Sequence, residues 1–472
     1  MTQFDPKFRR VNASSGRLSG WAVCLACAIL FVGCGAREEP PRTVILITID
    51  TLRADHLGTY GYPREVSPFL DDLAARSVVF DRAFSSCSHT APSHASLFTS
   101  LQPAQHRILV NGELLDEKLV TIAEVFGANG YATAAFTPVK FLTGLSAGFD
   151  YFGSSKKYES ADEVLARASA WIEQTGREKP AFVWIHLFDV HEWNVPRHRH
   201  RESITWVREN ARPNGSKLMS WLHENHGLPE EAKKSTRRWM AQQINRYDGQ
   251  LRELDRALGE FYGGLESRGF LEDSLWVVTA DHGEGLGNHD QMGHGRFLYD
   301  EQIRVPLFVH SPDGRFKPRR VSSIVRLVDG APTLAELTGV DMASQPIPVV
   351  GQSVLPLLRN RPSDWKAIEA FSQRRPADEK RLKEGWLDGQ VFAARSLDRK
   401  VIFSTEASGE VYDLVEDPFE LINLFDPGDP DMAELVRLLT ESFGFMESQG
   451  EAMQSGAASP EVIEELKALG YL

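Results

Sequence analysis

Cysteine is scarce in this chain, with four residues among 472. This number excludes a scaffold held together by many disulfides. Cys24, Cys27 and Cys34 all lie in the first forty residues, so Cys87 is the only cysteine in the remainder. If Cys24 and Cys27 lie in a leader segment that is removed and Cys34 carries lipid, Cys87 has no cysteine to pair with, and stability must come from a packed core.

Positive charge is also in short supply. The chain has 52 Lys and Arg against 65 Asp and Glu, which gives a formal net charge of −13 at pH 7. Proteins that bind nucleic acids present Lys and Arg to the phosphates, so we expect no nucleic-acid partner. The remaining composition, 42% hydrophobic and 25% charged, is typical of a globular protein.

The sequence lacks long hydrophobic runs apart from residues 21–32. That run is too short to span a bilayer, which takes about 20 apolar residues. Basic residues precede it, and a glycine and Cys34 follow it, so the segment resembles a bacterial lipoprotein leader. We therefore expect a signal peptide over residues 1–33 and a linker over 34–42. The mature chain would be exported to the periplasm or cell surface and anchored to a membrane through lipid on Cys34. A plain secretory leader and an uncleaved anchor are the alternatives.

Apolar, β-branched runs alternate with helical patterns after residue 42. The apolar runs cover 43–49, 182–187, 275–279 and 305–309, and the helical patterns cover 67–77, 121–129, 161–175, 245–268 and 331–338. This alternation predicts an α/β fold with a large, mostly parallel sheet sandwiched by helices. Three of the runs end at or near Asp50, Asp189 and Asp281. Ligands bind beyond the carboxyl ends of such strands, so these residues are site candidates.

The composition changes at two places in the sequence. Within the predicted catalytic domain, which we place at 43–345, residues 193–239 are polar and rich in Arg and His. They predict an insertion over the active-site face, either a lid or substrate-selecting element or a solvated surface excursion. Residues 346–472 predict a small C-terminal subdomain with an antiparallel sheet and a helix. Its expected elements are strands at 391–396 and 400–404 and a closing helix at 460–469.

Four side chains offer the ligands that a single divalent cation prefers. Asp50, Thr90, Asp281 and His282 supply carboxylate, hydroxyl and imidazole groups, which suit calcium, manganese, magnesium or zinc. Such an ion would lower the pKa of the Thr90 hydroxyl and neutralise charge on a transferring oxyanion. Each residue taken alone has a structural explanation, since an aspartate can cap a helix and Thr90 can belong to a turn. Their joint occurrence favours the metal site.

The segments that contain these residues resemble the sulfatase and phosphonate monoester hydrolase branch of the alkaline phosphatase superfamily. The matching segments are VILITIDTLRADHL at 44–57, TAPSH at 90–94, TADHGE at 279–284, His294 to Pro306, and VYDL with the residues after it at 411–424. The resemblance extends over nearly everything after residue 42 apart from the insertion. It implies an alkaline phosphatase-like fold and a metal-dependent hydrolase of ester bonds.

The resemblance also assigns the metal ligands and the nucleophile. It implies that Asp50, Asp281 and His282 bind the ion, and that Thr90 is the nucleophile and touches the ion as well. Thr51 stands where most sulfatases have a second aspartate, so the ion would have one carboxylate fewer.

The resemblance implies further roles for residues around this centre. His191 stands where the family has a histidine that contacts the scissile oxyanion or the leaving group, and His294 stands where many sulfatases have a lysine. We expect both to be catalytic, with His191 favoured as the acid that protonates the leaving group. Asn111 is a candidate phosphoryl contact, and His94 a candidate substrate-binding residue in place of the family's arginine. A second metal ion bound by Asp189, His191 and His294 is a less favoured alternative.

Threonine at position 90 bears on the type of ester. Sulfatases carry a cysteine or serine there that becomes formylglycine, whose hydrate expels sulfate, and threonine lacks this route. An unmodified alcohol can accept a phosphoryl group and lose it to water, so phosphate or phosphonate esters are favoured, as small molecules, glycans or lipids. The alternatives are a sulfuric ester hydrolase, an envelope phosphotransferase and a binding protein without activity.

Overall fold

The computed structural model describes residues 39–155, 158–175, 178–194, 234–339, 342, 345–406, 409–469 and 471, with the backbone alone for 234–237. The predicted signal peptide, Cys34 and most of the predicted insertion therefore lie outside the described residues. The chain divides into two units, Met1–Pro40 and Pro41–Leu472, and the second contains all the helices and strands described below. Within the described ranges, no helix is both long enough and apolar enough to cross a membrane.

An eight-stranded sheet forms the centre of this unit, in the order β10-β2-β9-β6-β1-β5-β3-β4. Strand β9 pairs antiparallel with β6 and β2, and the other neighbouring strands pair in parallel. The strands are β1 (Thr43–Ile49), β2 (Val78–Phe84), β3 (Ala132–Thr137), β4 (Tyr151–Ser154), β5 (Ala181–Leu187), β6 (Ser274–Thr279), β9 (Arg304–His310) and β10 (Arg319–Arg326). The predicted large and mostly parallel sheet is confirmed.

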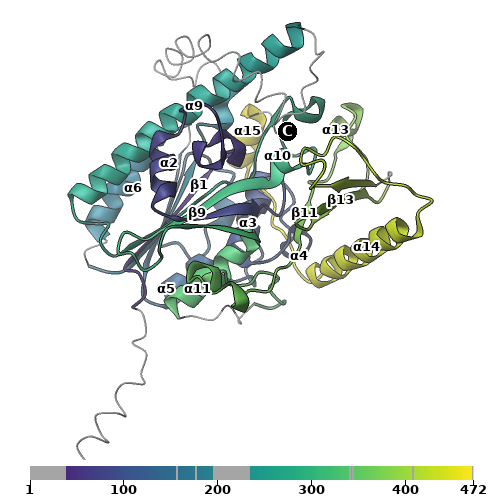
Figure 1. Ribbon diagram of the computed structural model, residues 1–472. Coiled ribbons are helices and arrows are strands. Elements are labelled where there is room, and N and C mark those ends of the chain that lie inside the picture. The colour runs from purple at the N-terminus through teal and green to yellow at the C-terminus, as the bar shows by residue number, and fades with distance from the viewer. Residues whose placement is uncertain are drawn as a thin grey trace, which may run out of the picture. The chain divides into compact units, whose positions relative to one another are not determined.

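Helices cover both faces of the sheet (Figure 1). Helices α2 (Pro68–Ala75), α6 (Ala161–Thr175) and α9 (Lys234–Ser267) pack together on one face, and α3 (Thr90–Thr99), α5 (Ile122–Ala128) and α11 (Gly330–Thr338) pack on the other. The shorter helices are α4 (Pro103–His106), α10 (Asp300–Ile303), α12 (Leu355–Leu358) and α13 (Glu379–Lys383). The 3-10 turns are η1 (Ala54–His56), η2 (Gly58–Tyr60), η3 (Thr143–Leu145), η4 (His191–Asn194), η6 (Asn288–Asp290), η7 (Leu327–Asp329) and η8 (Pro362–Asp364).

The central strands are apolar along their whole length because both sheet faces are covered. Every residue of β1 and β5 is buried, and Trp184 and Trp276 are among the largest side chains that are fully enclosed. The cross-strand register pairs Thr48 of β1 with His186 of β5 on one side and with Thr279 of β6 on the other. The residues that come after β1 and β6 therefore leave the sheet at the same edge.

A second sheet, in the order β11-β12-β13-β14, is antiparallel throughout. Its elements are β11 (Ala370–Gln373), β12 (Val391–Arg395), β13 (Arg399–Ser404) and β14 (Glu410–Asp413), and α14 (Pro430–Gly450) packs against it through Phe443. A two-stranded ribbon joins β7 (Gly285–Leu286) and β8 (Met292–Gly293). The predicted small antiparallel sheet is confirmed. The domain boundary at residue 345 stays a prediction.

The closing helix α15 (Pro460–Ala468) forms where the sequence predicted it. Ser459 caps its first turn by accepting a hydrogen bond from the backbone N–H of Val462. Val462 and Leu466 belong to the large core around the eight-stranded sheet, while Phe443 of α14 belongs to the core of the small sheet. The chain after α15 returns to the carboxyl edge of the large sheet, where the ring of Tyr471 lies near those of His89 and His191.

Candidate active site and metal centre

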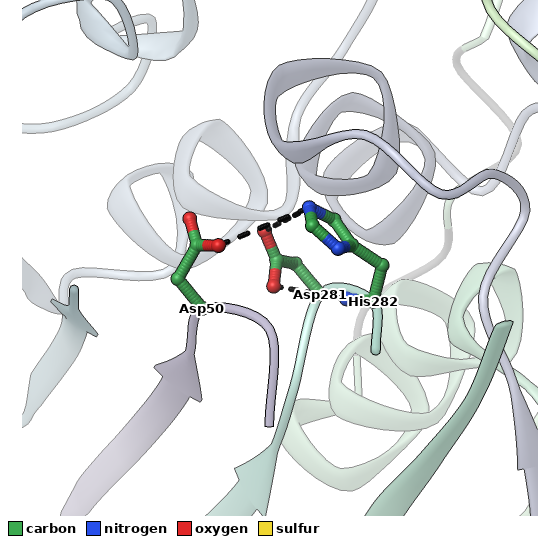
Figure 2. A group of neighbouring side chains, drawn as sticks. All are labelled: Asp50, Asp281 and His282. Atoms are coloured by element: carbon green, nitrogen blue, oxygen red, sulfur yellow. Dashed lines mark hydrogen bonds and ion pairs between the residues drawn. The ribbon is translucent and has the colours of Figure 1, made fainter. Parts of the chain in front are cut away.

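Two neighbouring parallel strands bring the predicted metal ligands together. Asp50 follows β1 directly, and Asp281 and His282 follow β6 after one alanine. One ligand atom from each of the three lies within 4.8 Å of those of the other two (Figure 2), and each residue is at most 1% exposed. Residues 231 positions apart in sequence therefore form one buried group, as the strand-end argument predicted.

The hydrogen bonds around this group leave a set of free ligand atoms. The backbone N–H groups of His282 (2.9 Å) and Thr51 (3.3 Å) donate to Asp281 Oδ1. His282 Nδ1 donates to the Gly283 carbonyl at 2.9 Å, so Nε2 carries the lone pair of the neutral ring. Asp281 Oδ2 and Asp50 Oδ1 are buried and accept no hydrogen bond from the described residues. These two carboxylate oxygens, 3.5 and 3.8 Å from His282 Nε2 with its imidazole lone pair, fit a divalent cation.

The pKa values of Asp50 and Asp281 agree with a cation site. Burial and the nearby charge of Asp50 raise the pKa of Asp281 to about 6. Burial also acts to raise the pKa of Asp50, but His186, His191 and His282 outweigh it and hold that pKa below the usual value. Two carboxylates in so small a space repel each other, and a bound cation would remove that repulsion.

Thr90 lies against this group at the first position of α3. Its Oγ1 donates to Asp50 Oδ2 at 3.3 Å and lies 3.4 Å from His282 Nε2. The residue is fully buried, and the N-terminus of a ten-residue helix favours negative charge at the hydroxyl. The structure thus places the predicted nucleophile within reach of the predicted ligands.

Strain marks the turn between these elements. Thr51 adopts φ 57°, a left-handed conformation that is rare for a β-branched residue and costs on the order of 1–3 kcal/mol. This conformation presents its backbone N–H to Asp281 Oδ1. Thr51 therefore contributes to the site through its backbone, although its side chain cannot replace a carboxylate.

His94 is bonded to the protein through both ring nitrogens, and its predicted contact with the substrate stays a prediction. Nδ1 of its ring lies 2.8 Å from the Thr90 carbonyl, and Nε2 lies 2.9 Å from the Thr48 hydroxyl. Both ring nitrogens are thus occupied, and the side chain is fully buried. A residue four positions after Thr90 lies one turn along α3, so its side chain reaches back to the first turn and down to β1. His94 therefore links the backbone of Thr90 to Thr48 of β1.

The Asn111 side chain is held next to Thr90 through its Oδ1. Its Oδ1 accepts a hydrogen bond from the backbone N–H of Ala91 at 2.9 Å, next to Thr90. Its Nδ2 is buried and has no partner in the described parts of the chain, so it is a free donor. A contact between Asn111 and the transferring group stays a prediction.

The two predicted catalytic histidines lie at the rim of the site. The ring of His294 is 4.5 Å from that of His282 and 5.1 Å from that of His191, centre to centre. His294 Nδ1 lies 3.4 Å from Glu284 Oε1, and His191 Nδ1 lies 3.2 Å from Glu192 Oε1. Each carboxylate holds one ring nitrogen, which fixes the orientation of the ring.

The two histidines differ in their protonation. Burial lowers the pKa of His294 in spite of Glu284. Burial also acts to lower the pKa of His191, but the hydrogen bond to Glu192 and the charge of Asp50 raise it to about 9. His191 is therefore protonated at neutral pH and is the better proton donor of the two.

Tyr471 is a member of the site that the sequence did not indicate. Its hydroxyl lies 2.7 Å from His191 Nε2, and its ring packs 5.7 Å from that of His89. Arg381 Nη2 donates to its carbonyl oxygen at 2.7 Å. No motif surrounds Tyr471 in the sequence, and the return of the chain after α15 is what brings it here.

Among the described residues, no second group of side chains is placed to hold another metal ion. Asp189 Oδ1 accepts a hydrogen bond from the backbone N–H of Ala161 at 3.1 Å, at the start of α6. Within the residues described, the side chains that could hold a metal ion gather at Asp50, Asp281 and His282.

An open cleft of about 570 Å³ adjoins the two histidines that the sequence predicted to be catalytic. Its lining includes His191, His294, Glu284, Trp193 and Trp239. Indole faces beside charged and hydrogen-bonding groups suit a ligand with both apolar and hydroxyl-bearing surfaces.

Comparisons with known proteins give family models and relatives that together match most of this chain. The family model Sulfatase matches residues 42–340, and the model N-sulphoglucosamine sulphohydrolase, C-terminal, matches residues 287–449. An N-acetylglucosamine-6-O-sulfatase of Bacteroides thetaiotaomicron is 30% identical, with 86% of this chain and 87% of the relative covered. An arylsulfatase of Clostridium perfringens is 24% identical, with 81% and 90% covered.

A solved structure shows the same fold. The phosphonate monoester hydrolase of Agrobacterium radiobacter superposes with a TM-score of 0.64 at 20% identity, with 89% of this chain and all of that chain covered. The predicted alkaline phosphatase-like fold is confirmed, and ester hydrolysis with a metal ion is typical of the family. On the match of the family model to most of its length, this chain belongs to the Sulfatase family.

Proposed function

We propose that this protein is a metal-dependent ester hydrolase in which the Thr90 oxygen is the nucleophile. The observation that carries the proposal is the position of Thr90 Oγ1, 3.3 Å from Asp50 Oδ2 and 3.4 Å from His282 Nε2. An ion held by Asp50, Asp281 and His282 would supply Lewis acidity to the Thr90 oxygen and to the transferring group.

Sulfate esters are the class that the relatives support best, in preference to the phosphate esters that the sequence alone favoured. The names of the bacterial relatives include an arylsulfatase and an N-acetylglucosamine-6-O-sulfatase. The substrate would be a sulfated glycan that enters the cleft beside Trp193 and Trp239. Phosphate and phosphonate esters are the second candidate, because Thr90 cannot form the aldehyde hydrate that expels sulfate.

The reaction would take two steps in either case. The Thr90 hydroxyl loses its proton to solvent, and its oxygen forms a bond to sulfur or phosphorus while the bond to the leaving alcohol oxygen breaks and His191 gives a proton to that oxygen. Asn111 Nδ2 would donate to the oxygens of the transferring group, and His294 would do so in its protonated form, because Glu284 holds the one proton of the neutral ring. Water then attacks the same sulfur or phosphorus atom, its two protons go to the departing Thr90 oxygen and to His191, and the sulfate, phosphate or phosphonate anion is released.

The location of the protein is part of the proposal. A leader cleaved before Cys34 and lipid on that residue would hold the enzyme at the outer side of a membrane, where exported glycans or lipids are available. Mass spectrometry of the N-terminal peptide tests this: an unmodified Cys34 in the mature protein would contradict the anchor.

Turnover of matched aryl esters tests the function. Purified protein would be assayed with one aryl alcohol esterified to sulfate, phosphate or phosphonate, with chelator and with added Mn²⁺, Ca²⁺ or Zn²⁺. We expect metal-dependent turnover that Thr90→Ala abolishes and that Thr90→Ser retains in part. Thr99→Ala in the same helix is the matched control, because Thr99 Oγ1 bonds only the Ala95 carbonyl among the contacts the structure gives it. Full activity of Thr90→Ala would remove Thr90 from the mechanism, and turnover of phosphorus esters alone would reverse the order of the two candidates.

A further inference from the structure

A positive charge reaches the nucleophile from the C-terminal sheet. The end of β11 is attached to the segment before Thr90, because Ser372 Oγ donates to the Ser85 carbonyl at 2.7 Å and Gln373 N donates to the Ser86 carbonyl at 2.8 Å. Two residues further on, Arg375 Nη1 lies 3.4 Å from Nε2 of His89. His89 immediately precedes Thr90, so a guanidinium stands beside the nucleophile segment.

Arg375 has no direct ion-pair partner among the described residues, and the more distant Asp378 only partly offsets its charge. Arg375 is 8% exposed, and no carboxylate among the described residues lies within ion-pair distance of it. Its Nε is buried without a hydrogen-bond partner in the same set. Burial and the neighbouring charge of Arg381 lower the pKa of Arg375 to about 10, so it stays charged at neutral pH. A buried charge without an ionic partner is unfavourable unless an anion joins it.

The surroundings add positive charge instead of removing it. The guanidinium groups of Arg374, Arg375 and Arg381 lie 5.8, 6.0 and 5.4 Å from the ring centre of Trp386. Arg381 forms an ion pair with Asp378, and Arg374 donates to the backbone carbonyls of Arg375 and Gly389. Arg375 thus has only the more distant Asp378, already paired with Arg381, as a negative neighbour in the described part of the chain.

Arg375 also fixes the protonation of His89. A guanidinium can only donate, so His89 Nε2 must accept, and the proton of the neutral ring must be on Nδ1. His89 Nδ1 is buried and has no partner within the described residues. It is therefore a donor without an acceptor, next to Gly295 and in a ring cluster with His294 and Tyr471.

We propose that Arg375 and His89 form an anion-binding pair that holds an anionic oxygen of the substrate beside Thr90. The inference rests on the proposed ester hydrolysis. The oxygen belongs either to the transferring sulfuryl or phosphoryl group or to a second acidic substituent, a carboxylate or sulfate, on the alcohol part. In both cases the pair supplies the positive charge that the segment around Thr90 lacks.

Binding of inorganic anions tests the pair without any turnover. Isothermal titration calorimetry would measure the dissociation constants of sulfate and phosphate for the metal-loaded protein. We expect Arg375→Gln to weaken at least one of them about tenfold or more, as for a lost charged hydrogen bond. Arg296→Gln is the matched control, because Arg296 lies nearby over Phe297 and donates to the Gly385 carbonyl. Unchanged binding by a folded Arg375→Gln would overturn the proposal.

Two further variants keep the test decisive. His89→Asn retains an N–H near the position of Nδ1 and should bind the anion more tightly than His89→Leu, which retains none; equal binding by both would exclude His89 from the pair. If Arg375→Gln does not fold, Arg375→Lys takes its place. Lysine keeps the charge but not the forked donor, so binding should again weaken. Binding by a folded Arg375→Lys as tight as that of the unaltered protein would then overturn the proposal.

The source of the anionic oxygen can be determined with two esters. One is a plain aryl ester, and the other carries an additional carboxylate on the ring. If Arg375→Gln raises KM for both equally, the oxygen belongs to the transferring group. If it raises KM only for the second, the oxygen belongs to the alcohol part. Loss of anion binding in a protein that turns over no ester would refute the proposed function but not the anion-binding pair.

Discussion

Replacing Asp281 with Asn should stabilise the protein without a metal ion and destabilise it with one. Asp281 Oδ1 would be replaced by the amide oxygen, which can still accept from the backbone N–H groups of His282 and Thr51. Oδ2, which has no hydrogen-bond partner in the described residues, would become an NH₂ group that faces the Asp50 carboxylate. The substitution therefore turns a repulsion between two carboxylates into an attraction.

The size of the effect can be worked from the pKa of Asp281, which is about 6 in the folded protein against an ordinary 3.8. This difference corresponds to roughly 3 kcal/mol of lost stability at neutral pH. The folded protein binds more protons than the unfolded chain between these two values, so the stability of the metal-free protein falls as the pH rises from about 4 to about 6. In Asp281→Asn this fall should be absent.

Thermal unfolding in chelator measures the expected stabilisation of Asp281→Asn, and thermal unfolding in excess Mn²⁺ or Ca²⁺ measures the expected destabilisation. For a chain of 472 residues, roughly 1 kcal/mol shifts Tm by about 1 °C, so we expect a rise of about 1–3 °C in chelator at pH 7. With an ion at about 100 times its Kd, the unaltered protein gains about 2.7 kcal/mol that the variant cannot gain in full.

Asp255→Asn is the control for this experiment. Asp255 is also a buried aspartate whose pKa is raised to about 6, mainly by burial, but it binds the backbone N–H groups of Phe69 and Leu70 at the start of α2. Its substitution should change Tm by the same amount with and without metal ion. If Asp281→Asn behaves in the same way, Asp281 does not bind the ion.

The remaining predictions concern the proton donor and the buried thiol. Tyr471→Phe removes the hydrogen bond to His191 Nε2, so turnover of esters with poor leaving groups should fall about tenfold while activated aryl esters change little, as a leaving-group series would show. Glu192→Gln removes a cause of the raised pKa of His191, so the alkaline limb of the pH–rate profile, expected near the pKa of about 9, should move to lower pH; an unmoved limb would assign the donor elsewhere. Burial raises the pKa of the Cys87 thiol, so peptide mapping should find it unlabelled by iodoacetamide until the protein unfolds.

The strand pattern of the sequence predicted the centre of the fold but not its edges. The expected run at 43–49 coincides with β1 because a strand buried on both faces is apolar at every position. Strands β2 and β10 gave no such signal, since β2 carries Asp81 and Arg82 and β10 contains three arginines. These two strands lie at one side of the sheet, where some residues of each strand are half-buried or exposed. Half-buried strands do not give continuous apolar runs.

The gathering of Asp50, Asp281 and His282 could be predicted because strand ends of a parallel sheet meet at one edge. Arg375 and Tyr471 could not, because the backbone contacts that bring them to Thr90 result from tertiary packing. Arg375 depends on the attachment of β11 to residues 85–86, and Tyr471 depends on the packing of α15 on the large core. His94 was placed in the correct segment, but a motif does not reveal which way a helical side chain points.

The buried role of His94 leads to a last prediction, on Thr48. The Thr48 hydroxyl accepts from Trp184 Nε1 at 3.0 Å, and it lies 3.0 Å from His186 Nδ1 and 2.9 Å from His94 Nε2. All four residues are fully buried, so Thr48→Val would leave three polar atoms without a partner. At about 1–3 kcal/mol for each, unfolding should become easier by roughly 3 kcal/mol or more.

Urea denaturation would compare Thr48→Val with Thr48→Ser, which keeps the hydroxyl and loses only a methyl group worth about 1 kcal/mol. We expect the Val variant to be the less stable of the two, although it buries more apolar surface. It should also lose turnover, because His94 holds the Thr90 carbonyl only while its other nitrogen has a partner. Equal stability of the two variants would mean that this network does not hold the nucleophile in place, and His94 would again be available for the substrate.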